Sequence, residues 1–404
     1  MNASATPVIV FGAFDRHNFG DLLFPHIVSA LLPRRKLFFA GLAQRDMRRY
    51  GGHVVQRLPT VLKGWSGEPP VLIHAGGELL GCDAWEAAIM LQDPQQAQTI
   101  IRRYHDQPLM RQQWADSCLG ISAQAPYMVC AADLLPDTRI VYNAVGGVDM
   151  SGKPAAMYTE IVSKLAAADA VGVRDEQTLK QLQQAGIEAL LLPDPAALVF
   201  ELFGEQIASR AEQGEVAAVR KAFPHGYLAM QFSADFGDDG TLAVIEAQLR
   251  SIVKDTACGI VLFCAGAAPW HDDRNVYLRL AARFSQNEVK VFQSLDIWDI
   301  CSLIADSHGY CGSSLHGRIT AMAYALPRLN LIHGSFHVDQ ISKQAAYAST
   351  WDEGSIPFAV LPTGLHKGLM RALTLATSRR KAIAGYCAQA YRRGFTELCA
   401  MAAI

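Results

Sequence analysis

"HGYCGSSLHGRITAMAYALPRLNLI" occupies residues 308–332 and has the pattern of a strand, a turn, a helix and a second strand. The apolar segments at its two ends are short and bounded by turn residues, as in buried strands. Between them, residues 315–325 favour a helix that Ser313 or Ser314 can cap and that Pro327 ends. Because a strand–helix–strand connection places its strands in parallel, this stretch predicts a parallel α/β fold.

The same alternation of strand and helix runs through the chain in two series. Buried strands are expected at 7–14, 36–41, 70–77, 138–147, 169–175 and 188–195, and again at 226–233, 259–266, 289–294, 308–313 and 327–332. We therefore expect two Rossmann-like, doubly wound domains, residues 1–200 and 201–364, with helices at about 365–404 packing back on the first. Polar, helix-prone residues 92–124 interrupt the first series and predict an insertion that could cover a site.

Composition and charge exclude several classes of protein. Half of the 404 residues are hydrophobic and only 18% are charged, which favours large buried sheets over a disordered chain. The formal net charge of −2 gives no reason to expect nucleic acid as a partner, because the basic runs are short and isolated. An anionic ligand must therefore be held by local groups.

The cysteines and the apolar segments bear on metal binding and location. The nine cysteines are scattered and form no CxxC pair, so we expect reduced thiols and no metal site. No apolar run reaches the roughly 18 residues of a spanning helix. The first residues carry no basic region followed by a cleavage site, so we expect no secretory leader and a cytoplasmic location, either free or at the inner face of the membrane.

Two turns of the first domain combine small and acidic residues at the end of an expected strand. In "FDRHNFGDLLF", Asn18 and Gly20 form a turn and Asp21 can cap the helix that follows. In "HAGGELLG", Gly76 and Gly77 allow close approach of the backbone, and Glu78 enters the turn. Such turns can present N–H groups to an anion or a sugar hydroxyl. A plain strand-to-helix turn with an acidic cap explains either sequence equally well.

Arg174 and His316 are the candidates for handling charge. Arg174 ends a strand in "VGVRDEQTLKQL", where it could bind an anion or pair with a carboxylate such as Asp175. Asp194, between two prolines, is expected to form a rigid turn. His316 lies in the first turn of the helix after Ser314, with Arg318 on the same face as Ser314. A helix N-terminus with an imidazole and a guanidinium can bind a phosphate or a carboxylate.

Taken in order, five motifs resemble those of the polysaccharide pyruvyl transferase family. They are "NFGD" (18–21), "GGELL" (76–80), "VRD" (173–175), "PDPA" (193–196) and "LHGRITAMAYALP" (315–327). The resemblance implies two Rossmann-like domains facing a cleft, as in B-type glycosyltransferases, and transfer of the enolpyruvyl unit of phosphoenolpyruvate to a sugar diol as a cyclic ketal. By that resemblance His316 corresponds to the catalytic histidine and Arg174 to an anion-binding arginine. One departure is Ser314, because the family often has Arg there.

The resemblance and the residue types together define a predicted site. His316 is the leading acid–base candidate, and Asp21 or Glu78 could deprotonate the acceptor. The groups predicted to bind phosphoenolpyruvate are Arg174, Ser313, Ser314 and Arg318, and those predicted to bind the acceptor are Asn18, Gly20, Gly76 and Gly77. We expect no metal and no cofactor apart from phosphoenolpyruvate as co-substrate. The expected partner is a saccharide, free or lipid-linked, in exopolysaccharide or cell-surface glycan biosynthesis.

Two alternatives belong to other classes of protein. A nucleotide-sugar-dependent glycosyltransferase could have the same architecture, because a fold does not dictate the donor. A non-catalytic saccharide-binding homologue could have kept the fold without the arginine at position 314, although His316, Arg174 and Arg318 argue against it. Binding of phosphoenolpyruvate or of a nucleotide sugar separates these possibilities.

Overall fold

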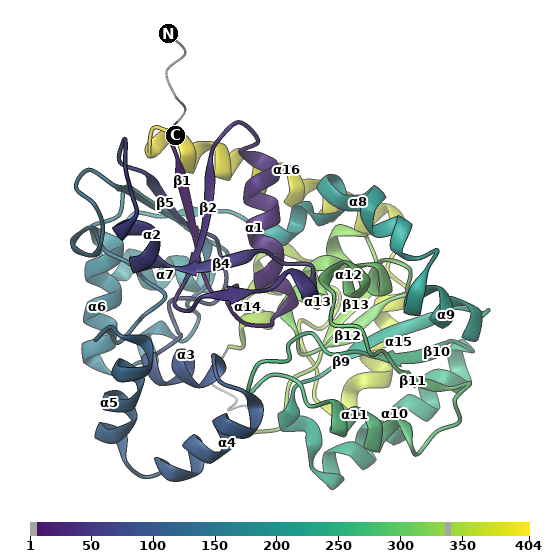
Figure 1. The fold of residues 1–404 in the computed structure, drawn as a ribbon. Helices are drawn as coiled ribbons and strands as arrows, with labels where there is room; N and C mark the ends of the chain where they lie inside the picture. The colour runs from purple at the N-terminus through teal and green to yellow at the C-terminus, as the bar shows by residue number, and fades with distance from the viewer. Residues whose placement is uncertain (1–5, 336–340) are drawn as a thin grey trace. The chain divides into compact units, whose positions relative to one another are not determined.

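The computed structural model describes residues 6–335 and 341–404 (Figure 1). The chain forms two compact units. Unit 1 comprises Met1–Pro195 and Ala390–Ile404, and unit 2 comprises Ala196–Gln389. The first five residues, to which the expectation of no secretory leader refers, lie outside the described part of the chain.

Within the described residues, unit 1 contains an eight-stranded sheet in the order β3-β4-β2-β1-β5-β6-β7-β8. Neighbouring strands are parallel except for β3 and β4. The strand order reverses between β1 and β5, as in doubly wound folds. The strands are β1 (Val8–Phe11), β2 (Leu37–Gly41), β3 (Arg45–Asp46), β4 (Val54–Arg57), β5 (Val71–His74), β6 (Arg139–Val145), β7 (Ala170–Val173) and β8 (Leu190–Leu191).

Unit 2 contains a five-stranded, wholly parallel sheet among its described residues, in the order β11-β10-β9-β12-β13. Here the order reverses between β9 and β12. The strands are β9 (Tyr227–Gln231), β10 (Gly259–Leu262), β11 (Val289–Val291), β12 (Tyr310–Gly312) and β13 (Arg328–Asn330). Strands β9, β10 and β12 are buried along their whole length, which explains their nearly continuous apolar sequences.

Helices connect the strands of both units. Those of unit 1 are α1 (Phe19–Leu31), α2 (Leu58–Lys63), α3 (Ala84–Met90), α4 (Pro94–Arg103), α5 (Pro108–Leu119), α6 (Ala155–Ala166) and α7 (Glu176–Gln184). Those of unit 2 are α8 (Val199–Arg210), α9 (Gly214–Ala222), α10 (Asp239–Thr256), α11 (Arg274–Ala281), α12 (Ile297–Ala305), α13 (Leu315–Ala323), α14 (Lys343–Trp351) and α15 (Leu365–Leu373). Helix α16 (Thr377–Met401) begins among the residues of unit 2 and ends among those of unit 1.

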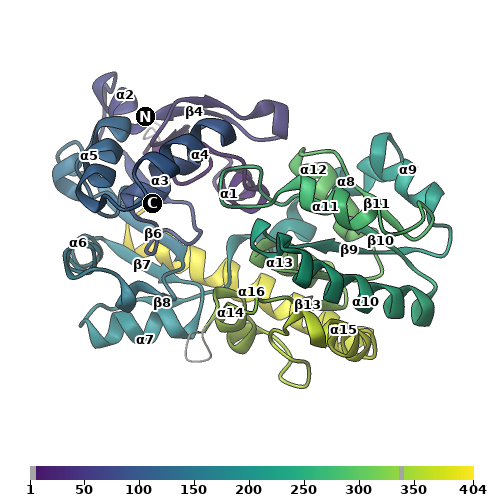
Figure 2. The same ribbon diagram turned by 90° about the horizontal axis from the view of Figure 1, so that it is seen from below.

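Each unit has its own apolar core against its sheet. In unit 2, helices α10 and α15 lie side by side (Figures 1 and 2) and pack their apolar residues on one face of the sheet. In unit 1, the predicted insertion forms α4 and α5. Helix α5 packs on α3 through Trp114 and Trp85, whose ring centroids lie 5.4 Å apart. Each segment expected to be a strand contains one, whereas the short strands β3 and β4 were not expected.

Gly172 of β7 tests how tightly the core of unit 1 is packed. A Cβ atom there would lie 2.6 Å from Leu192 Cδ2 and 2.8 Å from Leu398 Cδ1. We expect Gly172→Ala to lower the free energy of unfolding by about 1–3 kcal/mol, because a well-packed core resists added volume. Gly385→Ala is the matched control. Gly385 is an exposed residue of α16 with open space around it, and alanine should stabilise the helix by up to about 1 kcal/mol.

Thermal unfolding of both variants beside the parent protein checks this expectation. Equal melting temperatures for the parent and Gly172→Ala would show that the two leucines move aside without cost.

Candidate functional site

Most of the predicted site residues follow strands at which the strand order reverses, whereas Arg174 follows β7. In unit 1, the loop after β1 ends at Asn18 and leads into α1 with Gly20 and Asp21, and the loop after β5 carries Gly76, Gly77 and Glu78. In unit 2, the loop after β12 carries Ser313 and Ser314 and leads into α13 with His316 and Arg318. Ligands of doubly wound folds bind outside the carboxyl ends of the strands at such a reversal. The topology therefore gives both sets of residues the position of a ligand site.

The loop after β1 brings Asn18 and Asp21 to the loop after β5. Asn18 caps α1, and its Oδ1 accepts a hydrogen bond from the backbone N–H of Gly20 at 3.2 Å. Asp21, in the first turn of the helix, is 7% exposed. A Cβ on Gly77, whose φ is 97°, would lie 3.2 Å from Asp21 Oδ1. The acidic side chain and the glycine backbone are thus close neighbours.

Arg174 lies between two carboxylates of unit 1. It forms ion pairs with Glu78 and, at 3.1 Å, with Asp194, and it is 1% exposed. Burial alone would lower the pKa of Arg174, but the carboxylates of Glu78 and Asp194 raise it overall. Glu78 Oε1 also accepts a hydrogen bond from the backbone N–H of Val148 at 3.1 Å. Arg174 therefore fixes the orientation of Glu78, and its predicted contact with a donor anion stays a prediction.

Sequence reasoning missed a second buried group in the loop after β1. The hydroxyl of Tyr127 donates to Asp15 Oδ1 at 2.9 Å and accepts from Arg16 Nη1 at 3.1 Å. Asp15 Oδ2 accepts from the backbone N–H groups of Leu42 and Ala43. Burial raises the pKa of Asp15. The adjacent Asp15 and Arg16 were visible in the sequence, but nothing in the spacing indicates the partner Tyr127, more than 100 residues away.

In unit 2 the turn before α13 is held by hydrogen bonds from its own serines. Ser314 caps the helix, and its Oγ accepts from the backbone N–H of Gly317 at 3.2 Å. Ser313 Oγ accepts from the backbone N–H of Ser233 at 2.9 Å. His316 follows in the first turn and is 7% exposed. Within the described residues neither serine hydroxyl donates, so both O–H groups could donate to a ligand oxygen.

Gln231, the last residue of β9, is the functional candidate that sequence reasoning missed in unit 2. Its Oε1 accepts a hydrogen bond from the backbone N–H of Ser314 at 2.7 Å, and the residue is 3% exposed. On the other side of the turn, the hydroxyl of Tyr310 donates to the carbonyl of Ser314 at 3.0 Å. The signal available in the sequence was a polar residue at the end of the apolar segment "YLAMQ".

Arg318 shares one buried carboxylate with Arg328. Asp352, at the end of α14, pairs with Arg318 and accepts two hydrogen bonds from Arg328, one from Nε at 2.8 Å and one from Nη2 at 2.5 Å. Burial would raise the pKa of Asp352, but the two arginines lower it to about 2. The described contacts leave Nε and Nη1 of Arg318 without a hydrogen-bond partner, although the residue is 1% exposed. This group therefore carries one positive charge in excess.

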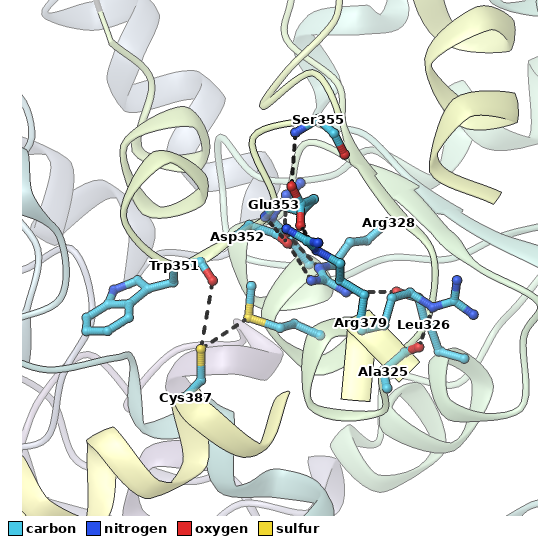
Figure 3. A network of polar contacts seen from close by, with 12 residues as sticks. Ala325, Leu326, Arg328, Trp351, Asp352, Glu353, Ser355, Arg379 and Cys387 are labelled. Carbon is cyan, nitrogen blue, oxygen red and sulfur yellow. Dashed lines mark hydrogen bonds and ion pairs between the residues drawn. The ribbon is translucent and has the colours of Figure 1, made fainter. Parts of the chain in front are cut away.

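Figure 3 shows that Asp352 is followed by a second acidic residue with its own partner: Glu353 pairs with Arg379 of α16. The two acidic residues lie in the wall of an open pocket of about 680 Å³, together with Trp351 and Tyr386. The described part of the chain holds no cluster of His, Cys, Asp and Glu side chains that could bind a metal ion. All nine cysteines are free thiols, as expected. None of the helices described is both long and apolar enough to cross a membrane.

Comparison with solved structures defines the class of the fold. A putative UDP-N-acetylglucosamine 2-epimerase from Listeria monocytogenes aligns over 98% of this chain and 96% of its own, with a TM-score of 0.53 and 11% identity. The UDP-GlcNAc 2-epimerase from Methanocaldococcus jannaschii aligns over 96% of this chain and 98% of its own, with a TM-score of 0.54 and 10% identity. Such distant likeness shows the fold alone, and it confirms the expected glycosyltransferase-B-like fold class with two Rossmann-like α/β domains.

The family follows from the sequence. A sequence model described as polysaccharide pyruvyl transferase matches residues 123–335, just over half of the chain. The chain belongs to this family, which confirms the resemblance seen in its motifs. Among curated proteins, none matches the chain.

Asp352 gives the first prediction for the site. We expect Asp352→Asn to lower the free energy of unfolding by about 3–5 kcal/mol at pH 7, because it leaves two buried guanidinium groups without a counter-charge. The matched control is Asp255→Asn. Asp255 pairs with His366 at the surface, where it is 45% exposed, so its removal should cost less than about 1 kcal/mol. Chemical unfolding of the parent protein and both variants measures the difference.

Acidification should reduce the contribution of Asp352. The pKa of this carboxyl is lowered to about 2 in the folded protein, so its stabilising effect is present above the usual carboxyl pKa near 4 and is lost as the pH falls towards 2. The gap in stability between the parent and Asp352→Asn should therefore shrink between pH 4 and pH 2. A gap that stays constant over this range would contradict the ion-pair account.

Proposed function

We propose that this protein transfers pyruvate from phosphoenolpyruvate to two hydroxyl groups of a saccharide, forming a cyclic ketal and releasing phosphate. Family membership supports the reaction class. The observation that carries the proposal is the turn before α13. There, His316 and two serine hydroxyls stand at a helix N-terminus, and Arg318 belongs to a group with one excess positive charge.

These groups suit phosphoenolpyruvate. The ligand brings a carboxylate and a phosphate of roughly −1.5 to −2 charge. The partial positive charge of a helix N-terminus attracts an anion, and hydroxyl and guanidinium N–H groups donate to its oxygens. Ser313, Ser314 and Arg318 all have hydrogens that the described protein groups do not use. We therefore assign the donor to this turn, with Arg318 as the cation that substitutes for the arginine missing at position 314.

His316 is the proposed acid and base of the reaction. Addition of a proton to the methylene carbon of phosphoenolpyruvate makes the neighbouring carbon an oxocarbenium-like centre. One sugar hydroxyl attacks that carbon and loses its proton. A second hydroxyl then attacks, the bond from carbon to the phosphate oxygen breaks, and the proton of this hydroxyl leaves with the phosphate. An imidazole in the first turn of α13 can deliver the first proton and accept one from an attacking hydroxyl.

The acceptor is assigned to the first turn of α1 with its cap, and to the loop after β5, in unit 1. Asp21 and Glu78 are carboxylates that can accept the proton of a sugar hydroxyl, and Asn18, Gly20, Gly76 and Gly77 shape the backbone beside them. The ion pair with Arg174 holds Glu78 in one orientation. The acceptor would be a saccharide, free or lipid-linked, in exopolysaccharide or cell-surface glycan biosynthesis on the cytoplasmic side of the membrane.

Donor binding gives the next prediction, with a matched pair of variants. Both Arg318 and Arg328 pair with Asp352. Arg328 donates hydrogen bonds from Nε, Nη1 and Nη2 to Asp352 and the carbonyl of Leu326, whereas Arg318 donates from Nη2 alone. We expect Arg318→Gln to weaken phosphoenolpyruvate binding by roughly ten- to hundredfold, because a charge-assisted hydrogen bond contributes about 1.5–3 kcal/mol. Arg328→Gln should cost similar stability and leave the affinity nearly unchanged.

Calorimetric titration with phosphoenolpyruvate, beside a thermal-shift screen of nucleotide sugars, makes the measurement. Equal loss of affinity in the two variants would argue against a contact between Arg318 and the donor. Stabilisation of the parent by a nucleotide sugar and not by phosphoenolpyruvate would favour a glycosyltransferase. A parent that binds neither donor but does bind saccharides would favour a non-catalytic homologue.

His316→Gln tests the assignment of the acid and base. Glutamine can still donate a hydrogen bond but cannot deliver a proton at neutral pH. We expect the variant to keep its melting temperature and most of its donor affinity, and to lose roughly 10²–10⁴-fold in turnover. Phosphate release in the presence of an accepting saccharide measures the rate. Turnover near that of the parent, in a folded variant, would end the assignment.

A further inference from the structure

We propose that Asp272 is a positioning residue for the turn before α13 and acts through Gln231. The ionised carboxylate of Asp272 fixes the side-chain amide of Gln231 in one orientation, and the amide oxygen then holds the backbone of Ser314. Binding of phosphoenolpyruvate by this turn rests on the proposed function. Control of the turn by Asp272 does not depend on that function.

Two hydrogen bonds connect Asp272 to the turn through Gln231, and a third anchors its carboxylate to Ala265. The backbone N–H of Ser314 donates to Gln231 Oε1 at 2.7 Å, and Gln231 Nε2 donates to Asp272 Oδ1 at 2.6 Å. The backbone N–H of Ala265 donates to Asp272 Oδ2, also at 2.6 Å. Each donor meets an acceptor because an ionised carboxylate can only accept. If the Gln231 amide turned over, Nε2 would face the N–H of Ser314 and the contact would be lost.

The chain of contacts lies at the reversal of strand order in unit 2. Gln231 ends β9, Ala265 follows β10 and Ser314 follows β12, and these three strands are neighbours in the sheet. Asp272 comes from the loop between β10 and α11. The network therefore extends from the ends of β10 and β9 to the backbone of Ser314, two residues before His316. Strand β13 lies on the other side of β12 and takes no part in it.

Protonation of Asp272 would disrupt its hydrogen bonds with Gln231 and Ala265. A neutral carboxyl group must donate one hydrogen, but Gln231 Nε2 at one of its oxygens and the N–H of Ala265 at the other are both donors. Burial raises the pKa of Asp272 to about 7, against the lowering effect of hydrogen bonds from Ala265, Gln231, Gly266 and Tyr277. The carboxylate that orders the turn would thus be lost within the physiological range of pH.

The titratable groups near Asp272 are Tyr277 of α11, Cys264 beyond β10 and Tyr310 of β12, together with His271, Asp273 and Arg274 on its own segment. Burial raises the pKa of Cys264 to about 12 and raises those of both tyrosines. Asp273 and Arg274 carry opposite charges, and the group among these whose pKa burial raises to about 7 is Asp272.

Stability and function should respond to pH in opposite directions. Because folding raises the pKa of Asp272, its contribution to stability is greatest below the usual carboxyl pKa near 4 and is lost as the pH rises to about 7. Order in the turn, in contrast, should increase over the upper part of that range. The ionised form of Asp272 lowers the stability of the fold, so a role in stability alone would not require it.

Two exchanges of amide for carboxylate test the proposal, singly and together. In Asp272→Asn, one N–H of the new amide must face another N–H, from Ala265 or from Gln231. In Gln231→Glu, two carboxylates meet. In the double variant Q231E/D272N every hydrogen bond can be rebuilt: Ser314 N–H to one oxygen of the new Glu side chain, the new Asn amide to its other oxygen, and Ala265 N–H to the Asn oxygen. Asp273→Asn, which changes the neighbouring charge only, is the control.

The first measurement needs no ligand. Amide hydrogen exchange at Ser314 should be slow in the parent at pH 8, about tenfold faster in each single variant, and slow again in the double variant and in Asp273→Asn. In the parent, the protection factor should fall as the pH is lowered through about 7, in step with the carboxyl resonance of Asp272. Protection that is unaffected by Asp272→Asn, or that stays lost in the double variant, would overturn the proposal.

The second measurement is phosphoenolpyruvate affinity by calorimetry, compared between variants at each pH because the phosphate itself titrates near pH 6. We expect a loss of about tenfold at pH 8 in each single variant and recovery to within about threefold in the double variant. Affinity that follows melting temperature instead of Ser314 protection would overturn the role in donor binding. If the parent binds no phosphoenolpyruvate, the proposed donor is wrong, and amide exchange alone decides whether Asp272 orders the turn.

Discussion

The pairing of β12 with β9 is the contact on which the geometry of unit 2 depends. Gly312 lies opposite Gln231 in the sheet, and a Cβ on Gly312 would lie only 2.3 Å from the carbonyl oxygen of Gln231. The absence of a side chain lets the two strands end together, so that Ser314 comes within hydrogen-bond reach of Gln231 at the end of β9, and Ser313 within reach of Ser233. Gly317 extends the same constraint into α13, since a Cβ there would lie 2.5 Å from the ring of Tyr310. The position of His316 is therefore set by the close packing of the backbone at Gly312 and Gly317, on either side of it.

In unit 1, too, glycines shape the candidate site, but through the conformation of their own backbone. Gly76 and Gly77 both have positive φ angles, 121° and 97°, which non-glycine residues adopt only with strain. This conformation turns the chain after β5 towards α1, where Asp21 and Phe24 lie against it. Glu78 then points to Arg174 after β7, and the carbonyl of Gly77 accepts from the backbone N–H of Gly146 after β6 at 2.8 Å. Loops from four neighbouring strands are thus tied to one another through a segment of three residues.

The sequence predicted the strands better than the contacts of the site. Buried parallel strands need apolar residues on both faces, so their segments stand out locally, and the residue types at the strand ends marked Asn18, Asp21, Glu78 and His316. Strands β3 and β4 were missed because they are short and partly exposed. The partners of Arg318 could not be predicted, because Asp352 lies 34 residues away at the end of a helix and its pairing depends on packing alone. The contact between Asp272 and Gln231 could not be predicted either, because the two residues lie 41 positions apart and meet only through packing.

The charges of the two units differ in a way that bears on the chemistry. In unit 1 one buried arginine, Arg174, meets two carboxylates, whereas in unit 2 one buried carboxylate, Asp352, meets two arginines. Buried charge is costly unless it is balanced, so a surplus of either sign is expected mainly where a ligand completes the balance. A surplus of negative charge suits proton removal from a neutral hydroxyl, and a surplus of positive charge suits an anionic donor. Under the proposed function, Arg318 supplies the positive charge in excess over Asp352, while position 314 is a serine. The cation, Arg318, lies one helical turn after position 314, and Ser314 provides the N-cap, which a guanidinium group could not provide.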